Sequence, residues 1–261
     1  MNIQCSATNL AAIAQLRDIY RHEMHCQVMY DSLHSRPGWT TPYMLTVEGE
    51  PAGYGAVAHA GPWKDKPTIF EFFVLPDQRD RMIRLFKELV KATGTRSVET
   101  QTNRTMLAVM LHAFCPSVVA EAILYEDGLL TSLAIPGATV RQVTRGDAKQ
   151  IAARQLDDGA EWLLQLGDEI VGTGGILYHY NRPYGDIFMS IAEPFRRRGL
   201  GAFLVQELKR ISYEGGSIPA ARCNVDNTAS QMTLQKAGFV PCGNIVTGTL
   251  RETFGDSSQI G

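Results

Sequence analysis

Long apolar runs are missing from this 261-residue sequence, although 44% of its residues are hydrophobic. No stretch approaches the roughly 18 apolar residues that a transmembrane helix needs, so we expect no membrane partner. The first residues, Met1–Ala7, also lack the basic and apolar regions of a secretory signal. The sequence therefore predicts a protein that is made and kept in the cytoplasm.

Paired cysteines and a strong net charge are missing as well. The five cysteines are an odd number without a Cys-x-x-Cys pair, which fits neither a disulfide framework nor a common zinc site. His22, His25 and Cys26 lie close together but lack the partners of a zincin helix, so we expect no metal. A formal charge of -2 gives no broad electrostatic surface for nucleic acid, and no nucleic-acid partner is expected.

What the sequence does contain is an internal repeat. Tyr43–Gly55 aligns without gaps with Trp162–Gly174, and each segment has two apolar runs around a glycine-containing turn. This pattern is typical of a β-hairpin. In both copies a helical pattern, a short strand and a second helical pattern follow. Coincidental likeness of two α/β segments is the alternative, and the unbroken hairpin register argues against it.

The repeat predicts how the chain divides. A stretch containing proline and glycine, Ala134–Ala138, marks the join. We therefore predict an α/β protein of two tandem domains, residues 1–135 and 138–261, each a mixed, mostly antiparallel sheet flanked by helices. About thirty helix-like residues precede the hairpin of the first half, whereas only Ala148–Ala160 precede that of the second.

A glycine-bearing loop opens a predicted helix in the second half. Arg196–Gly201 follows a predicted strand, Asp186–Ala192, and leads into a helix that begins near Leu200. The first amides of a helix have no internal partner and its dipole is positive there, so the loop suits a pyrophosphate. Three consecutive arginines add guanidinium groups that pair with phosphate oxygens. The pattern is neither a P-loop nor a dinucleotide fingerprint, so its context decides.

That context resembles the GNAT superfamily of acyl-coenzyme A-dependent N-acyltransferases. The coenzyme loop of the family reads Arg/Gln-x-x-Gly-x-Gly/Ala between the fourth strand and the following helix, and a later motif places Asn, Lys, Gly and Phe at fixed spacing. The resemblance covers about residues 138 to 243. The residues that match the two motifs are Arg196, Gly199, Gly201, Asn227, Lys236, Gly238 and Phe239.

The resemblance implies a function and a coenzyme site. It implies transfer of an acetyl group from acetyl-CoA to a small-molecule or peptide amine in a ternary complex. We expect a monomer or homodimer, and no metal. The implied coenzyme-binding residues are Ile191, Arg196, Arg197, Arg198, Gly199, Leu200, Gly201, Ala202 and Asn227. For Asn227 a helix N-cap is the alternative role.

The sequence departs from the family at a catalytic position. Where many members carry a tyrosine that protonates the leaving thiolate, this sequence has Leu234. Asp186 is the candidate for the group that takes the proton of the amine, with a turn residue as the alternative reading. Other candidates near the expected cleft, none fixed by spacing, are His179, Tyr180 and Tyr184. Cys223 is a candidate for a covalent acyl-cysteine route, with a buried strand cysteine as the favoured alternative.

The first half lacks the features of a coenzyme loop. Its corresponding stretch, Pro76–Met82, has no glycine and places Asp77 and Asp80 where phosphate would lie. We expect a degenerate copy that shapes the acceptor site or an interface. Its candidate cleft residues, for which core packing is the favoured alternative, are Tyr20, Tyr30, His34 and Trp39. A regulatory or scaffold protein that binds coenzyme A is the second functional reading, favoured by Leu234.

Overall fold

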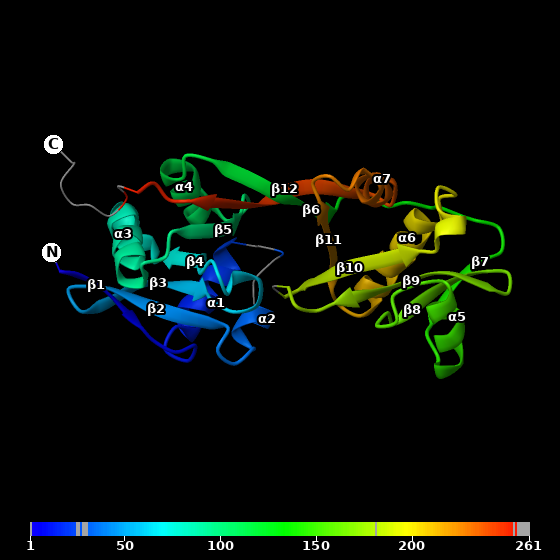
Figure 1. Ribbon diagram of the computed structural model, residues 1–261, viewed down its shortest axis with the longest axis horizontal. Coiled ribbons are helices and arrows are strands. Elements are labelled where there is room, and N and C mark those ends of the chain that lie inside the picture. The colour runs from blue at the N-terminus through cyan, green and yellow to red at the C-terminus, as the bar shows by residue number, and fades with distance from the viewer. Residues whose placement is uncertain (1, 25–26, 28–30, 181, 253, 255–261) are drawn as a thin grey trace. The chain divides into compact units, whose positions relative to one another are not determined.

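The computed structural model describes residues 2–24, 27, 31–180, 182–252 and 254 (Figure 1). The chain forms two compact units. Unit 1 comprises Met1–Glu121 with Gly243–Gly261, and unit 2 comprises Ala122–Cys242. Within the described residues, no helix has the length and apolar character needed to cross a membrane.

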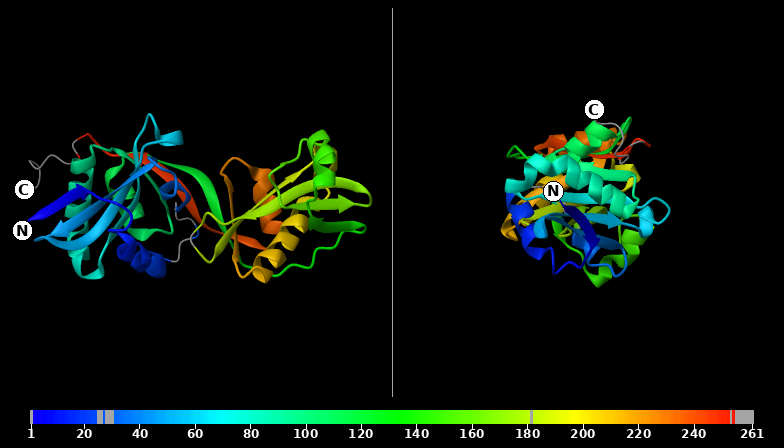
Figure 2. Two further views of the ribbon diagram at one scale, coloured as in Figure 1. Left: turned by 90° about the horizontal axis from the view of Figure 1, so that it is seen from below. Right: turned by 90° about the vertical axis from the view of Figure 1, so that its left-hand side faces the viewer.

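Unit 1 is a six-stranded sheet with helices on both faces. In spatial order its strands are β1 (Ile3–Ala7), β2 (Thr40–Val47), β3 (Glu50–Ala58), β4 (Thr68–Val74), β5 (Ser97–Gln101) and β12 (Phe239–Thr249). Its helices are α1 (Ala14–Met24), α2 (Asp31–His34), α3 (Met82–Thr93) and α4 (Thr105–Phe114), with short 3-10 turns at Gly61–Trp63 and Pro76–Arg81. Figure 2 shows β1, in dark blue, at the edge of this sheet beside β2.

Neighbouring residues of β3 show which helices cover which face of unit 1. Tyr54 packs edge-on against Tyr20 of α1, with ring centroids 6.2 Å apart. Gly55, next in the strand, faces Leu89 of α3, whose side chain lies where a Cβ would be. Successive residues of a strand point to opposite faces of its sheet. Helices α1 and α3 therefore cover opposite faces.

Unit 2 repeats the arrangement with fewer helices. In spatial order its strands are β6 (Val118–Asp127), β11 (Ile218–Asn224), β10 (Tyr184–Ile191), β9 (Glu169–Leu177), β8 (Trp162–Leu166) and β7 (Ala138–Gln142). Its helices are α5 (Ala148–Ala153), α6 (Leu200–Glu214) and α7 (Thr228–Lys236), with 3-10 turns at Arg145–Asp147 and Glu193–Phe195. Gly174 of β9 lies against Leu208 of α6, so the long helix covers one face directly.

The hairpins confirm the predicted repeat. Tyr43 pairs with Gly55 in unit 1, and Trp162 pairs with Gly174 in unit 2, which are the equivalent positions of the sequence alignment. Both hairpins also carry a register shift one residue before the turn-proximal pairs. The predicted fold class, α/β with two mixed and mostly antiparallel sheets, is confirmed.

The last strand of each copy belongs to the sheet of the other unit. Residues 122–126 of β6 pair with 220–224 of β11 in unit 2, and residues 245–249 of β12 pair with 97–101 of β5 in unit 1. The compact units therefore differ from the predicted ranges 1–135 and 138–261. A boundary placed at a proline- and glycine-containing connection does not reveal that the strands on either side of it are exchanged.

A buried ion pair fastens the exchanged strand β6 within unit 2. Lys209 of α6 lies 2.5 Å from Asp127, and the two side chains are only 6% and 7% exposed. The Lys209 ammonium also donates to the carbonyl oxygens of Leu129 and Ala237, at 2.9 and 2.8 Å. Breaking a buried pair of this kind costs about 3–5 kcal/mol, so the end of β6 is firmly held.

A second buried charge cluster lies under α1 and α2 of unit 1. Glu71 of β4 is fully buried and contacts Arg17 at 3.3 Å and His34 at 3.1 Å. Arg104 lies slightly further away, at 3.9 Å. Burial by itself raises the pKa of the Glu71 carboxyl, but Arg17, His34 and Arg104 outweigh it and hold that pKa well below its ordinary value. The cluster therefore depends on an ionised Glu71.

We expect Glu71→Gln to destabilise unit 1 by about 3 kcal/mol at neutral pH, because Arg17 and His34 lose their buried counter-charge. A carboxyl whose folded pKa is depressed stabilises the protein above its unfolded pKa, near 4.5, and loses this contribution as pH falls toward the lower folded value. Urea unfolding at pH 7 and pH 4 should show the gap between wild type and variant shrinking at the lower pH. A gap that widens there would contradict the assignment.

Candidate functional site

Among the described residues, strands β10 and β11 of unit 2 pair only at their beginnings. Their parallel register comprises Tyr184 with Ile218, Gly185 with Pro219, and Asp186 with Ala220. Beyond that point β10 continues to Ile191 and remains paired with β9. Two parallel strands that separate expose main-chain donors and acceptors between them, and an extended ligand can occupy such a gap in the manner of an added strand.

The loop at the far end of β10 has the geometry of an anion site. Arg197 and Gly199 are both left-handed, with φ of 64° and 80°. In the described part of the chain, the backbone amides of Arg197 to Ala202 donate to no protein acceptor, whereas those flanking them, of Arg196 and Phe203, are bonded to Glu193 and Gly199. Consecutive amides without partners at the positive end of α6 form a concave site for phosphate.

Basic side chains surround this loop in distinct ways. The Arg196 Nε atom donates to the carbonyl oxygen of Ile191 at 3.0 Å, so the first arginine braces the loop against β10. Arg198 lies over the ring of Phe195, 5.4 Å from its centroid. The Lys236 ammonium of α7 lies 3.4 Å from the point where Gly199 would carry a Cβ. The lysine was matched in the family motif, but its position beside Gly199 was not foreseen.

Gly201, Leu200, Ala202 and Asn227 each have a packing or capping role. A Cβ on Gly201 would lie 3.1 Å from Thr233 of α7, so this glycine sets the close approach of α6 and α7. Leu200 and Ala202 are buried, and their side chains belong to the core. Asn227 caps α7, since its side-chain oxygen accepts from the Ser230 amide at 3.0 Å. The alternative reading of Asn227 as an N-cap is therefore realised.

We expect Arg197→Gly to separate loop strain from coenzyme affinity. A non-glycine residue in the left-handed region costs about 1–2 kcal/mol, which a glycine relieves, while the loss of one guanidinium costs a phosphate-bearing ligand about tenfold in affinity. The unfolding midpoint should stay equal or rise, and calorimetry should show weaker acetyl-CoA binding. In the control Arg198→Gly, whose φ is not positive, stability should fall. A destabilised Arg197→Gly would contradict the strain argument.

Asp186 lies where β10 and β11 part, and it is not isolated. Its Oδ2 atom is 3.2 Å from His179 Nε2 and 3.8 Å from Arg222 Nε. Its side chain is 8% exposed, against 28% for His179 and 42% for Arg222. The His179 ring packs edge-on against Tyr180, with centroids 4.6 Å apart. The structure thus brings together three of the predicted candidates and adds Arg222, which the sequence did not point to.

Leu234, which stands where many members of the resembled family carry a catalytic tyrosine, lies in the core of unit 2. Leu234 of α7 is 4% exposed and packs in the same cluster as Cys223 and Tyr125. Burial and the neighbouring Cys223 raise the pKa of Tyr125 to about 12, and burial raises the pKa of the Cys223 thiol. Cys223 is therefore a buried strand cysteine kept as a thiol, as its alternative reading expected. Tyr125 reaches this cluster on the exchanged strand β6, so no local pattern pointed to it.

The corresponding gap in unit 1 is filled by side chains of the unit itself. In the part of the chain that the structure describes, strands β4 and β5 pair only through Thr68 with Ser97 and Ile69 with Val98. Beyond these pairs, Arg104 donates to the Phe70 carbonyl oxygen at 3.2 Å, and the Val74 amide contacts the sulfur of Met106 at 3.4 Å. The stretch Pro76–Arg81 is a 3-10 turn, and among the described residues none with positive φ lies in it.

Most of the candidate cleft residues of the first half pack against other side chains of unit 1. Tyr20 is 1% exposed and interacts with Arg104, while His34 is bound to Glu71. Trp39 lies under the guanidinium of Arg36, and Tyr30 lies outside the described residues. Where these side chains are described, packing is thus the observed role.

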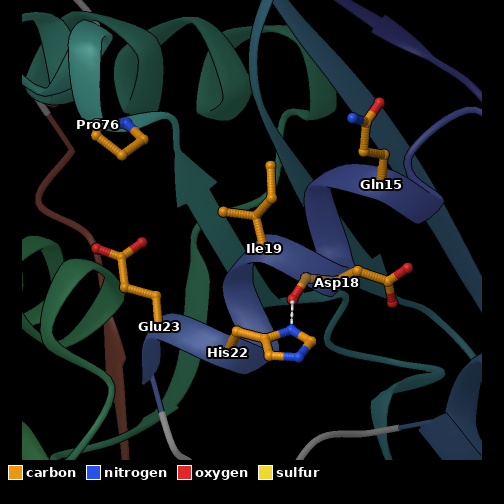
Figure 3. A pocket seen from close by; sticks show the side chains of 6 residues that line it. All are labelled: Gln15, Asp18, Ile19, His22, Glu23 and Pro76. Atoms are coloured by element: carbon orange, nitrogen blue, oxygen red, sulfur yellow. Dashed lines mark hydrogen bonds between the residues drawn. The ribbon is translucent and has the colours of Figure 1, made fainter.

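An open pocket on unit 1 has little suited to phosphate. It lies between α1 and the Pro76 turn, and Figure 3 shows the hydrogen bond from His22 Nδ1 to the Asp18 carbonyl oxygen at 2.8 Å. Asp18 and Glu23 give it an acidic lining. Within the described residues no group of side chains is arranged to hold a metal, and His25 and Cys26 lie outside them. The residues that line the pocket are Gln15, Asp18, Ile19, His22, Glu23 and Pro76.

Solved structures share the whole fold. A GNAT-family acetyltransferase from Colwellia psychrerythraea superposes with a TM-score of 0.75 at 13% identity, over 96% of this chain and 100% of its own. A tandem GNAT protein from the clavulanic acid biosynthesis pathway gives 0.61 at 13% identity, over 94% and 97%. A GCN5-related N-acetyltransferase from Sphaerobacter thermophilus gives 0.57 at 17% identity, over 94% of each. At these identities the likeness establishes the fold.

Part of the sequence matches a known family. Residues 133–239 match the model of the acetyltransferase (GNAT) family. A search among curated proteins found no match. The matched segment contains β7 to α7 and the glycine-bearing loop, so this part of the chain is similar to the GNAT acetyltransferase family.

Proposed function

We propose that the protein transfers an acetyl group from acetyl-CoA to the amine of a small molecule or peptide, and that unit 2 binds the coenzyme. The proposal includes action in the cytoplasm, as a monomer or homodimer. The observation that carries it is the loop from Arg197 to Ala202, whose amides donate to no acceptor among the residues that the structure describes. That loop lies at the end of a strand, β10, which has parted from its parallel neighbour.

Each part of the site suits one part of acetyl-CoA. The amides of Arg197 to Ala202, with Lys236 beside Gly199, suit the pyrophosphate. The edge of β10 up to Ile191 suits the amide groups of the pantetheine arm, which pair with main chain as a strand does. Arg196, Arg197 and Arg198 supply positive charge around the loop. Asn227 contributes by capping α7 and holding that helix beside the loop.

Unit 1 is, in this proposal, a degenerate copy that does not bind coenzyme. Arg104 and Met106 already occupy the gap between β4 and β5. The turn Pro76–Arg81 carries Asp77 and Asp80, whose carboxylates repel phosphate. We propose that unit 1 serves the acceptor side or an interface instead.

Catalysis rests on positioning and on one proton acceptor. The amine must be neutral to attack the thioester, so a group at the parting of β10 and β11 has to take a proton. Asp186 lies at that point. Leu234 donates no proton, so the thiolate leaves without assistance from that position, and holding the two reactants together supplies much of the rate.

A coenzyme A-binding regulatory protein is the second candidate. It is favoured by Leu234, which is buried in an apolar cluster. Many members of the family that this sequence resembles carry a catalytic tyrosine at that position. Such a protein binds acetyl-CoA but acetylates no amine.

Calorimetric titration of the intact protein with acetyl-CoA, followed by a thiol-release assay with a panel of primary amines, tests the proposal. We expect one equivalent bound and acetylation of at least one amine. Binding without acetylation would favour the regulatory protein, and folded protein that binds no acetyl-CoA would reject both.

A further inference from the structure

We propose that His179 is the catalytic base of unit 2 and that Asp186 is its positioning residue. The inference rests on the proposed acyltransferase function and refines it, because it moves the proton from the carboxylate to the imidazole.

The pair lies where the acyl group of the donor is expected. Ile191 lies five positions after Asp186 in β10, which is about 17 Å at a rise of about 3.3 Å per residue. The phosphate loop begins just beyond Ile191, and β10 and β11 rejoin at Asp186. An extended arm that starts at the loop and follows the open edge of β10 therefore ends beside Asp186 and its neighbours.

Exposure distinguishes the two members of the pair. The Asp186 side chain is 8% exposed, and its Oδ2 atom faces both His179 and Arg222. A carboxylate enclosed in this way has little room for a substrate nitrogen. The His179 side chain is 28% exposed, so the imidazole is the member that an acceptor amine can reach.

The hydrogen bond assigns the tautomer of His179. Because Nε2 lies 3.2 Å from a carboxylate oxygen, the neutral ring carries its proton on Nε2 and leaves the lone pair on Nδ1. Tyr180 holds the ring by edge-on packing at 4.6 Å. A carboxylate that accepts a hydrogen bond from one ring nitrogen fixes the orientation and tautomer of the imidazole. The other nitrogen is then available to accept a proton.

The groups that face this pair come from three elements. Asp186 is on β10, Arg222 is on β11, and Tyr180 follows His179 in the connection between β9 and β10. Arg222 lies over the Tyr180 ring, 5.7 Å from its centroid, and 3.8 Å from Asp186 Oδ2. Its positive charge therefore lies beside the carboxylate that orients His179.

The reaction balances with His179 in this role. The neutral amine nitrogen attacks the thioester carbon, a C–N bond forms and the C–S bond breaks. The nitrogen gives its proton to Nδ1 of His179, and the thiolate leaves with the electron pair of the C–S bond. Water then supplies a proton to the thiolate and accepts the proton of the imidazolium, so the products are the amide and free thiol.

Histidine-selective NMR on the intact protein tests the inference before any acceptor is known. His179 signals are assigned by their absence from the His179→Gln spectrum. We expect the Nε2–H tautomer in the wild type, a mixture of tautomers in Asp186→Asn, and a shift of the His179 signals when acetyl-CoA is added. Unchanged His179 signals with calorimetrically bound acetyl-CoA would overturn the inference and leave the proposed function standing.

Kinetics with the fastest amine of the panel gives the second test. We expect His179→Gln to lower kcat about 100-fold or more, to lose the rising limb of the pH–rate profile, and to keep its acetyl-CoA affinity. Asp186→Asn should keep the limb but lower kcat less. The control is His22→Gln, because His22 is an exposed histidine of α1 in unit 1. This variant should keep the wild-type kcat and the wild-type pH–rate profile. A wild-type rate and profile in His179→Gln would reject the inference, and absence of coenzyme binding or of any acetylation would reject it together with the proposed function.

Discussion

Residues 122–242 should fold as an independent unit, whereas residues 138–261, the range that the sequence repeat marks as a domain, should not. The shorter range keeps residues 122–126 of β6 beside β11. The longer range removes that strand and leaves the edge of β11 with unpaired donors and acceptors. It also carries residues 245–249, whose partner β5 is absent.

The energetic cost of losing β6 is large compared with the stability of a small domain. Leu124 and Tyr125 are fully buried, and each loses several kcal/mol of packing when removed. Lys209, whose side chain is 6% exposed, loses the carboxylate of Asp127 and becomes a buried charge without its counter-charge, at about 3–5 kcal/mol. These losses together reach the 5–15 kcal/mol that stabilises a typical domain.

Circular dichroism and thermal unfolding of three fragments check this prediction. Residues 122–242 should unfold cooperatively and bind acetyl-CoA with affinity close to that of the intact protein. The matched control 138–242, which lacks β6 but also lacks the unpaired tail, should be unfolded like 138–261. Cooperative unfolding of 138–261 at the same midpoint as 122–242 would contradict the role of the exchanged strand.

Gly199→Asp should lower acetyl-CoA affinity by at least about 100-fold without unfolding unit 2. Gly199 is left-handed, with φ of 80°, and the nearest atom to its Cβ position is the Lys236 ammonium at 3.4 Å. Aspartate tolerates the left-handed region better than most residues, and its carboxylate meets a cation. The same carboxylate neutralises Lys236 and repels pyrophosphate, and like charges brought together cost several kcal/mol.

A matched substitution at the other end of α6 controls for backbone strain. Gly216 has φ of 78° and open space around its Cβ position, and the helix between the two glycines is about 22 Å long. Gly216→Asp should therefore bind acetyl-CoA as the wild type does. Equal weakening in both variants would show that strain, rather than charge at the loop, controls binding.

Local patterns predicted the parts of the molecule that local interactions determine. The hairpin positions Tyr43 and Trp162 pair with the expected glycines, because alternation and turn residues lie within one short segment. The start of α6 was placed at Leu200, where it begins. The strand β1, Ile3–Ala7, was not predicted, since its five residues lie beside helix-like sequence and gain their structure by pairing with β2.

Contacts between residues far apart in the sequence were not predicted. The pairing of β6 with β11 joins residues about a hundred positions apart, and nothing in either segment specifies its partner. For the same reason Tyr125 was not connected with Cys223 and Leu234. His179 and Asp186 were both named as candidates, but their hydrogen bond depends on how the connection between β9 and β10 folds back.

The exchange of strands also determines the order in which the two units complete their folds during translation. Residues 1–121 emerge first, yet the sheet of unit 1 lacks its β12 neighbour until residues 245–249 have been synthesised. Unit 2 needs only residues 122–242 and has them all at an earlier moment. The half that is translated first is thus the half that completes its fold last, and until residues 245–249 have been synthesised the edge of β5 is open to chaperones and to mispairing.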